Sequence, residues 1–251
     1  MNSLDRTFAI LNARGPKWPV VIVALVVILG GTALLVWLGG EVVERDWPTT
    51  YDPTVGQWFI DARTPLLTSL ATAATFMGGL LCIGTLSVLV VIFFLVRRRW
   101  TAALTVGVTM ALSGVVTLVV KNLVRRARPS IDVVLGTPDT QFSWPSGHTF
   151  NSTVFYGLLA GFVILWLRSR WARALVALGW LALVACVGLS RIYLGYHWLT
   201  DVIAGFVLGL VVLAMVALVH EFWIRRDSHL RNIEDDSPAG GKDLVHREGS
   251  R

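Results

Sequence analysis

The chain has 251 residues, of which 55% are hydrophobic and only 15% are charged. Soluble domains carry about 25% charged residues, so this composition excludes an ordinary soluble domain and indicates a polytopic membrane protein. The formal net charge is +6. In a soluble protein that charge would suggest a nucleic-acid partner, but in a membrane protein basic residues set the topology, and we expect no nucleic-acid partner.

Six apolar stretches are long enough to cross a bilayer, which takes about 20 helical residues. They lie between a basic leader, residues 1–17, and a polar tail, residues 225–251, whose composition predicts a solvated, disordered segment. The first stretch lacks a signal-peptide cleavage site, so we expect it to be retained as a helix. The expected membrane helices occupy residues 18–38, 66–96, 101–120, 149–167, 172–189 and 199–223. The sequence therefore predicts an all-α bundle of six transmembrane helices over residues 18–224.

The first connection, residues 39–65, mixes acidic residues with Trp and Tyr, as expected for a segment at the level of the lipid headgroups. Within the second stretch, "FMGG" at residues 76–79 suggests a point of close helix packing. Cys82 and Cys186 lie in apolar stretches far apart in the sequence, and they match no metal or disulfide motif. We expect both to be buried free thiols.

The basic residues also predict the orientation. The leader and the basic segments 97–99, 168–173 and 225–226 fall on one side of a six-helix topology, so both termini are expected in the cytoplasm. The stretch 121–147 should then face outward, yet its basic residues outnumber its acidic ones: Lys121, Arg125, Arg126 and Arg128 against Asp132 and Asp139. Positive charge on that side indicates an anionic ligand, although a strongly determined topology also tolerates a few such charges.

Three polar stretches interrupt the apolar pattern: "KNLVRRARP" at 121–129, "PSGH" at 145–148 and "SRIYLGYHWLTD" at 190–201. Six-helix topology brings all three to the same outward end of the bundle. Basic side chains at the mouth of a bundle suit a phosphate group, and Arg128 can bind it with two hydrogen bonds. The alternatives are that Lys121 extends to the interface and that Arg128 pairs with lipid headgroups.

The second and third stretches combine helix starts with histidine. Ser146 is a candidate N-cap, and Gly147 lets an oxyanion approach the free amides of a helix N-terminus. A plain cap would not need His148 beside it. His197 and Asp201 are four residues apart, so on a helix the carboxylate can orient the imidazole. The alternative is a polar pair that only caps the last helix.

Two further points concern the same end of the bundle. Arg191 adds another phosphate-type donor. A set of two histidines and one carboxylate could also ligate a metal, but the nearby cationic groups would oppose a divalent ion, and we expect none. Arg125 and Arg126 have no assigned role. Arg125, four residues after Lys121, either lines the same mouth or faces solvent and headgroups.

In chain order the three stretches read K-x6-R-P, P-S-G-H and S-R-x5-H-x3-D, complete across residues 121–201. This pattern resembles the type 2 phosphatidic acid phosphatase superfamily, which includes membrane lipid phosphatases, soluble acid phosphatases and vanadium haloperoxidases. The six-helix plan extends the resemblance over nearly the whole chain. The resemblance implies a phosphatase that needs neither a metal nor another cofactor.

The resemblance also implies roles for individual residues. His197 would attack the phosphorus and form a phosphohistidine, Asp201 would orient His197, and His148 would protonate the leaving group and then activate water. The remaining motif positions would bind the phosphoryl oxygens: Lys121, Arg128, Ser146, Gly147 and Arg191. Charge stabilisation and positioning of this kind are most of what phosphoryl transfer requires.

The membrane setting predicts a lipid phosphate monoester or diphosphate as substrate, hydrolysed on the extracytoplasmic side of the cell membrane. We favour an isoprenoid diphosphate of the undecaprenyl type over phosphatidate or phosphatidylglycerol phosphate. The non-enzymatic alternative is a transporter with a basic anion vestibule, which would not need a His–Asp pair and a second histidine. A vanadate-binding haloperoxidase is disfavoured by the six helices. The sequence contains no signal for the oligomeric state.

Overall fold

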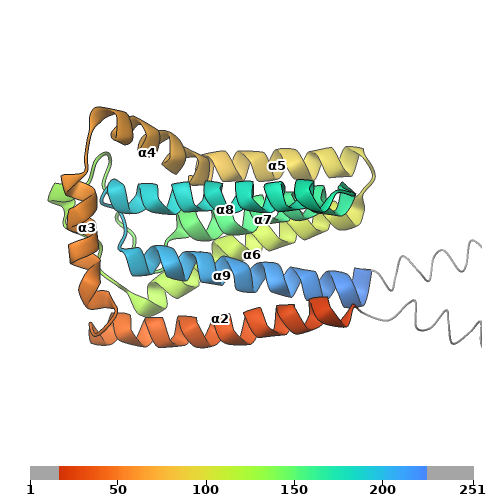
Figure 1. Cartoon of the computed structure of the whole chain (residues 1–251), viewed down its shortest axis with the longest axis horizontal. Coiled ribbons are helices and arrows are strands. Elements are labelled where there is room, and N and C mark those ends of the chain that lie inside the picture. Colours follow the sequence, from red (N-terminus) through yellow and green to blue (C-terminus); the bar gives the residue numbers. More distant parts are fainter. Residues whose placement is uncertain (1–16, 225–251) are drawn as a thin grey trace, which may run out of the picture.

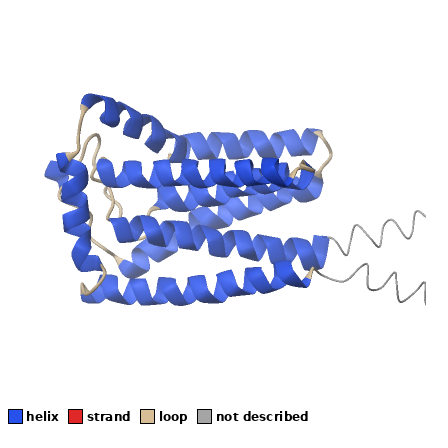
Figure 2. Ribbon diagram, in the orientation of Figure 1, coloured by secondary structure: helices blue, strands red, loops and turns tan. Residues whose placement is uncertain are grey.

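The structure is a computed structural model that describes residues 17–224, and in this range it contains helices and loops but no strand (Figures 1 and 2). The long helices are α2 (Trp18–Glu44), α4 (Pro65–Gly78), α5 (Leu80–Val96), α6 (Trp100–Val124), α7 (Gly147–Trp166), α8 (Arg170–Tyr193) and α9 (Leu199–Val219). The short ones are η1 (Thr49–Tyr51), α3 (Asp52–Asp61), η2 (Ile131–Val133) and η3 (His220–Ile224). The predicted tail, and all of the leader except its last residue, lie outside the described residues.

Five of the helices are long and apolar enough to cross a membrane, and α4 with α5 forms a bent pair that makes a sixth span. The prediction of an all-α bundle with six membrane helices is therefore confirmed. The predicted helix over residues 66–96 is not continuous, because α4 and α5 meet at a 43° bend. Gly79, between them, has extended backbone angles (φ −71°, ψ 153°) that end one helix and begin the next.

The residue before this bend lets α4 approach its neighbours closely. A Cβ atom on Gly78 would lie 2.3 Å from a methyl group of Val187 on α8 and 3.4 Å from the Cβ of His148 on α7. Only a residue without a side chain fits there. The bend therefore brings the α4–α5 junction against the start of α7, where the "PSGH" stretch lies.

Helix α9 packs along α2 and α7, and α7 also packs against α8. Two glycines four residues apart, Gly205 and Gly209, face α7. Added Cβ atoms would lie 2.6 Å from the carbonyl oxygen of Ser146 and 2.5 Å from the Cβ of Thr153, respectively. Small residues at this spacing allow membrane helices to approach with their backbones in contact. The first turns of α7 and α9 are therefore held side by side.

At one end of the bundle, α3 lies across the axes of the long helices (Figure 1). The predicted connection 39–65 therefore contains the last turns of α2, the turn η1 and α3. Arg63, after α3, donates hydrogen bonds to the carbonyl oxygens of Tyr193 (2.8 Å) and Val133 (2.7 Å). The described chain begins and ends at the opposite end of the bundle (Figure 1).

Candidate active site

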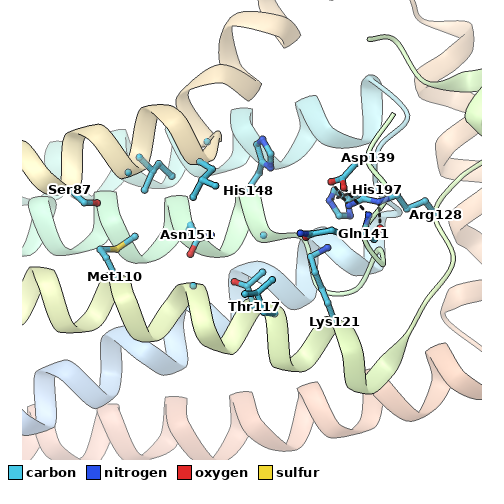
Figure 3. A pocket seen from close by; sticks show the side chains of 17 residues that line it. Ser87, Met110, Thr117, Lys121, Arg128, Asp139, Gln141, His148, Asn151 and His197 are labelled. Carbon is cyan, nitrogen blue, oxygen red and sulfur yellow. Dashed lines mark hydrogen bonds and ion pairs between the residues drawn. The ribbon is translucent and has the colours of Figure 1, made fainter. Parts of the chain in front are cut away.

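A cavity of about 450 Å³ lies between α5, α6 and the start of α7. Five of the residues singled out from the sequence line it: Lys121, Arg128, Gly147, His148 and His197 (Figure 3). The other three, Ser146, Arg191 and Asp201, are buried around it. The three polar stretches, far apart in the sequence, thus meet at one place in the structure.

His197 lies between α8 and α9 and is 3% exposed. Its Nδ1 is 3.2 Å from Oδ2 of Asp201, which also accepts hydrogen bonds from the Trp198 amide (2.9 Å) and the Ser143 hydroxyl. Burial lowers the pKa of His197 to about 3, although the hydrogen bond and charge of Asp201 act to raise it. The imidazole is therefore neutral near pH 7. With the Nδ1 proton directed at Asp201, the lone pair is on Nε2.

The second oxygen of Asp201 contacts a residue that the family pattern does not include. Oδ1 accepts a hydrogen bond from Nη1 of Arg126 at 2.5 Å, and Nη2 of the same guanidinium is 2.6 Å from Oδ2 of Asp52. The sequence left the role of Arg126 open, and the structure shows that two buried carboxylates hold its side chain. Arg125 is exposed, and its Nε donates only to the carbonyl oxygen of Asn122.

Sequence reasoning missed three residues of this cluster: Asp52, Ser143 and Arg126. Arg126 and Asp52 are 74 residues apart, and Ser143 is 58 residues from Asp201. No short-range spacing connects them, so only the folded chain identifies them as partners. A weak signal was present for Asp52, which is an acidic residue directly before a proline at a helix start.

Lys121 and Arg191 are buried cations, each 5% exposed. Lys121 Nζ donates to the carbonyl oxygen of Phe142, and Arg191 Nη1 donates to the Thr75 hydroxyl at 2.8 Å. The Arg191 guanidinium lies over the Tyr196 ring, 3.9 Å from its centroid, and its buried Nε has no hydrogen-bond partner. Within residues 17–224 neither cation contacts a carboxylate. A buried charge without a counter-ion is costly, so both positions favour an anionic ligand.

Arg128 connects the cavity to the loop above it. Nε donates to the carbonyl oxygen of Gln141 (2.6 Å), Nη1 to that of Tyr196 (2.7 Å), and Nη2 pairs with Asp139 (2.6 Å). Nη1 also lies 3.4 Å from Nε2 of His197. Burial lowers the pKa of Arg128 from its ordinary value, and the Asp139 carboxylate opposes that shift. A phosphate oxygen near His197 would thus be within reach of this guanidinium.

The "PSGH" stretch begins α7. Ser146 occupies the N-cap position, but its side chain does not cap the backbone: its Oγ accepts from the Thr149 hydroxyl at 3.1 Å. Its own amide donates to the carbonyl oxygen of Asp201 (3.0 Å), which joins the starts of α7 and α9. The amides of Gly147 and His148 precede the first hydrogen bond of the helix, made by Phe150. Free amides at a helix N-terminus bind anions.

His148 also lines the cavity, but its imidazole has no hydrogen bond to any residue of the described range. It is free to contact a ligand. Among residues 17–224, no three His, Cys, Asp or Glu side chains gather closely enough to hold a metal ion. The groups suited to bind an anion at this site are two histidines, three cations and the free backbone amides of α7.

The rest of the cavity wall is largely apolar and comes from α5 and α6. Residues from Leu80 to Ser87 line it on α5, and residues from Met110 to Leu118 line it on α6. Seven residues of helix span about 10 Å, so this wall continues well beyond the histidines. The cavity therefore joins an anion site to an apolar slot, as a phosphorylated amphiphile requires.

The same combination of motif and fold occurs in known proteins. A profile of the PAP2 superfamily matches residues 102–225. The chain is 29% identical over 169 residues to phosphatidylglycerophosphatase B of Bacillus subtilis, covering 66% of this chain and 81% of that protein. It is 39% identical over 112 residues to decaprenylphosphoryl-5-phosphoribose phosphatase of Mycolicibacterium smegmatis, covering 43% of this chain and 53% of that protein.

Solved structures show the same fold. The crystal structure of a transmembrane PAP2-type phosphatidylglycerolphosphate phosphatase from Bacillus subtilis superposes with a TM-score of 0.71 at 25% identity, covering 78% of this chain and 96% of that one. Aquifex aeolicus LpxE superposes with a TM-score of 0.52 at 22% identity, covering 66% of this chain and 94% of that one. The second likeness concerns the fold alone.

Proposed function

This chain belongs to the PAP2 superfamily as a multi-pass membrane lipid phosphatase, and we propose that it hydrolyses an isoprenoid lipid phosphate or diphosphate of the undecaprenyl type. The observation that carries the proposal is a pair of buried cations, Lys121 and Arg191, that contact no carboxylate within residues 17–224 and lie beside a neutral histidine oriented by a carboxylate. A transporter vestibule would use the cations but not the oriented histidine.

In the first half of the reaction, the phosphoryl oxygens bind Lys121, Arg128, Arg191 and the free amides at the start of α7. The lone pair on Nε2 of His197 attacks phosphorus, an N–P bond forms, and the P–O bond to the leaving group breaks. His148 donates a proton to the leaving oxygen. Asp201 stabilises the imidazolium character that develops on His197. The fixed cations stabilise the charge on the transferred group.

In the second half, a water molecule attacks the phosphorus of the phosphohistidine. His148 accepts a proton from this water, the N–P bond breaks, and its electron pair returns to Nε2 of His197. Inorganic phosphate leaves, and the enzyme returns to its starting protonation state. The same two histidines thus serve both halves in opposite roles.

The choice of lipid rests on two supports. The mycobacterial relatives act on a lipid with a decaprenyl chain, and the apolar wall formed by α5 and α6 offers a surface for such a chain. A second candidate, phosphatidylglycerol phosphate, is favoured by the Bacillus relative and by the solved structure that matches most of this chain. Phosphatidate is a third substrate of the same chemistry.

We further propose that the site faces the extracytoplasmic side. The basic segments 97–99 and 168–173 lie at the end of the bundle opposite the cavity, and positive charge is retained on the cytoplasmic side. Cysteine labelling of Ser130→Cys, in the exposed loop after α6, tests this in whole cells. Labelling by an impermeant reagent supports the proposal, and labelling only after lysis contradicts it. A background with Cys82 and Cys186 replaced by serine is the control.

The activity test uses the purified protein in detergent micelles. Phosphate release is measured from undecaprenyl diphosphate, phosphatidylglycerol phosphate and phosphatidate, each with and without EDTA. We expect the highest kcat/KM on the isoprenoid substrate, no loss with EDTA, and no release by His197→Ala. A higher kcat/KM on phosphatidylglycerol phosphate would show that this lipid, and not the isoprenoid, is the preferred substrate. Activity in His197→Ala would refute the phosphohistidine mechanism.

A further inference from the structure

We propose that Arg126 and Asp52 are positioning residues for the reaction: they fix the Asp201 carboxylate and, through it, the orientation of His197. This inference rests on the proposed role of His197 as nucleophile. Neither residue lines the cavity that holds the two histidines. Both act from behind it, through contacts that the motif positions do not supply.

Hydrogen bonds to both of its oxygens fix the orientation of the Asp201 carboxylate. Oδ2 accepts from the Trp198 amide and the Ser143 hydroxyl and lies 3.2 Å from Nδ1 of His197, whereas Oδ1 is bound by Nη1 of Arg126 at 2.5 Å. Asp201 is 0% exposed, so in the intact protein both of its oxygens depend on these protein donors. Without Arg126, Oδ1 would be a buried, unpaired carboxylate oxygen, and the carboxylate could rotate to regain a donor.

Asp52 in turn fixes Arg126. Oδ2 of Asp52 is 2.6 Å from Nη2 of Arg126, and both Asp52 oxygens accept from Thr200, through its amide (3.0 Å) and its hydroxyl (2.5 Å). The Thr200 hydroxyl also accepts from Arg126 Nη1 at 2.7 Å. Since Thr200 precedes Asp201 in the first turn of α9, the guanidinium and both carboxylates form one closed network.

The network also joins separate elements of the fold. Asp52 is the first residue of α3, which crosses the end of the bundle, and Arg126 is the second residue after α6. The Arg126 guanidinium lies 5.6 Å from the centroid of the Trp198 ring, next to His197 in the chain. Asp201, which orients His197, is therefore held by Arg126 from the loop after α6, and Arg126 is held by Asp52 from α3.

The test compares Arg126→Gln, Arg126→Lys and the charge-balanced double variant Asp52→Asn/Arg126→Gln. Arg125→Gln is the matched control, since this neighbouring side chain is exposed and donates only to a backbone carbonyl. Each variant is assayed in detergent for kcat and KM, for inhibition by inorganic phosphate, and for its thermal unfolding midpoint. The phosphate inhibition constant reports the anion site separately from the orientation of His197.

We expect Arg126→Gln to lower kcat about 10²-fold, the cost of misplacing a reacting group by about an ångström. KM and the phosphate inhibition constant should stay within about threefold of wild type, because Arg126 does not line the cavity and its loss removes no contact with the bound substrate. Arg126→Lys should recover part of kcat, since it keeps the charge but not the two-pronged geometry. Arg125→Gln should behave as wild type.

Three results would overturn the proposal. The first is a wild-type kcat in Arg126→Gln, the second is a loss of kcat with an equal loss of phosphate inhibition, and the third is no gain in Arg126→Lys. If Arg126→Gln does not fold, the double variant replaces it, and a wild-type kcat there would have the same meaning. Absence of phosphatase activity in the wild type itself would instead refute the proposed function.

Discussion

Two sets of buried charges lie next to each other at one end of the bundle, and only in one of them does every charge contact an opposite charge within residues 17–224. We call Arg126, Asp52 and Asp201 the paired cluster, because every charge in it contacts an opposite charge at 2.5 or 2.6 Å. We call Lys121 and Arg191 the open cluster, because neither contacts a carboxylate within the described residues. The two clusters differ in role: the paired cluster fixes the orientation of Asp201 and His197, and the open cluster is suited to bind an anionic ligand.

The largest effect should come from the member of the paired cluster that touches His197. In Asp201→Asn, one carboxylate oxygen becomes an amide nitrogen, which cannot accept the hydrogen bonds that surround Asp201. The variant therefore no longer holds the His197 imidazole in its orientation. We expect kcat to fall about 10⁴-fold, as for other carboxylates that orient a catalytic histidine. Measured phosphate release checks this, and a loss below about tenfold would show that the orientation of His197 does not depend on Asp201.

The next effect concerns stability. Arg126→Met leaves two neighbouring buried carboxylates without their shared cation, so the free energy of unfolding should fall by about 3–5 kcal/mol. Unfolding in detergent, followed by circular dichroism, measures it. Arg125→Met is the control and should stay within about 0.5 kcal/mol of wild type, because that side chain is exposed. Equal losses in the two variants would show that the contacts of Arg126 with the two carboxylates do not stabilise the fold.

The open cluster should respond in the opposite direction. Arg191→Met removes a buried cation that has no counter-ion, so the free energy of unfolding should stay constant or rise, while kcat/KM falls about 10²–10³-fold. Inorganic phosphate should raise the unfolding temperature of the wild type more than that of the variant, because a ligand stabilises the state that binds it. A variant that is both inactive and much less stable would show that Arg191 serves the fold.

The buried histidine gives the stability of the protein a defined pH dependence. The pKa of His197 is about 3 in the folded state, below the ordinary value of 6.5, so between these values the unfolded chain binds more protons. The free energy of unfolding should therefore fall as the pH falls from 6.5 toward 3, by at most about 1.4 kcal/mol per unit from this group. The difference between wild type and His197→Asn isolates its contribution. An equal slope in both proteins would contradict this assignment.

The smallest effect belongs to the one ion pair at the cavity that is open to solvent. Asp139 is 36% exposed and pairs with Arg128, where a phosphate oxygen would compete with it. Exposed ion pairs are worth about 0–1 kcal/mol, so Asp139→Asn should lower KM by at most about fivefold and leave kcat unchanged. Steady-state kinetics decide this, and a higher KM would mean that Asp139 helps to bind the substrate.

The two clusters also differ in how far the sequence predicts them. The six membrane helices followed from apolar length, and the meeting of Lys121, His148 and His197 followed from the topology alone. Of the paired cluster, only Asp201 could be found from the sequence, because Asp52 and Arg126 lie in separate parts of the chain and no short-range spacing connects them with Asp201. The bend at Gly79 was also missed, since hydropathy measures how apolar a segment is and not whether its axis is straight.

The division of the cavity wall has a consequence for engineering. The apolar slot is formed by α5 and α6, whereas the contacts that orient His197 come from α3, the loop after α6 and the start of α9. The positions that line the slot are therefore different from those that orient His197, although α6 also carries Lys121 of the anion site. Grafting the slot-lining positions of α5 and α6 from a relative should exchange lipid preference while keeping the catalytic rate constant, which makes this bundle a scaffold for lipid phosphatases of chosen selectivity.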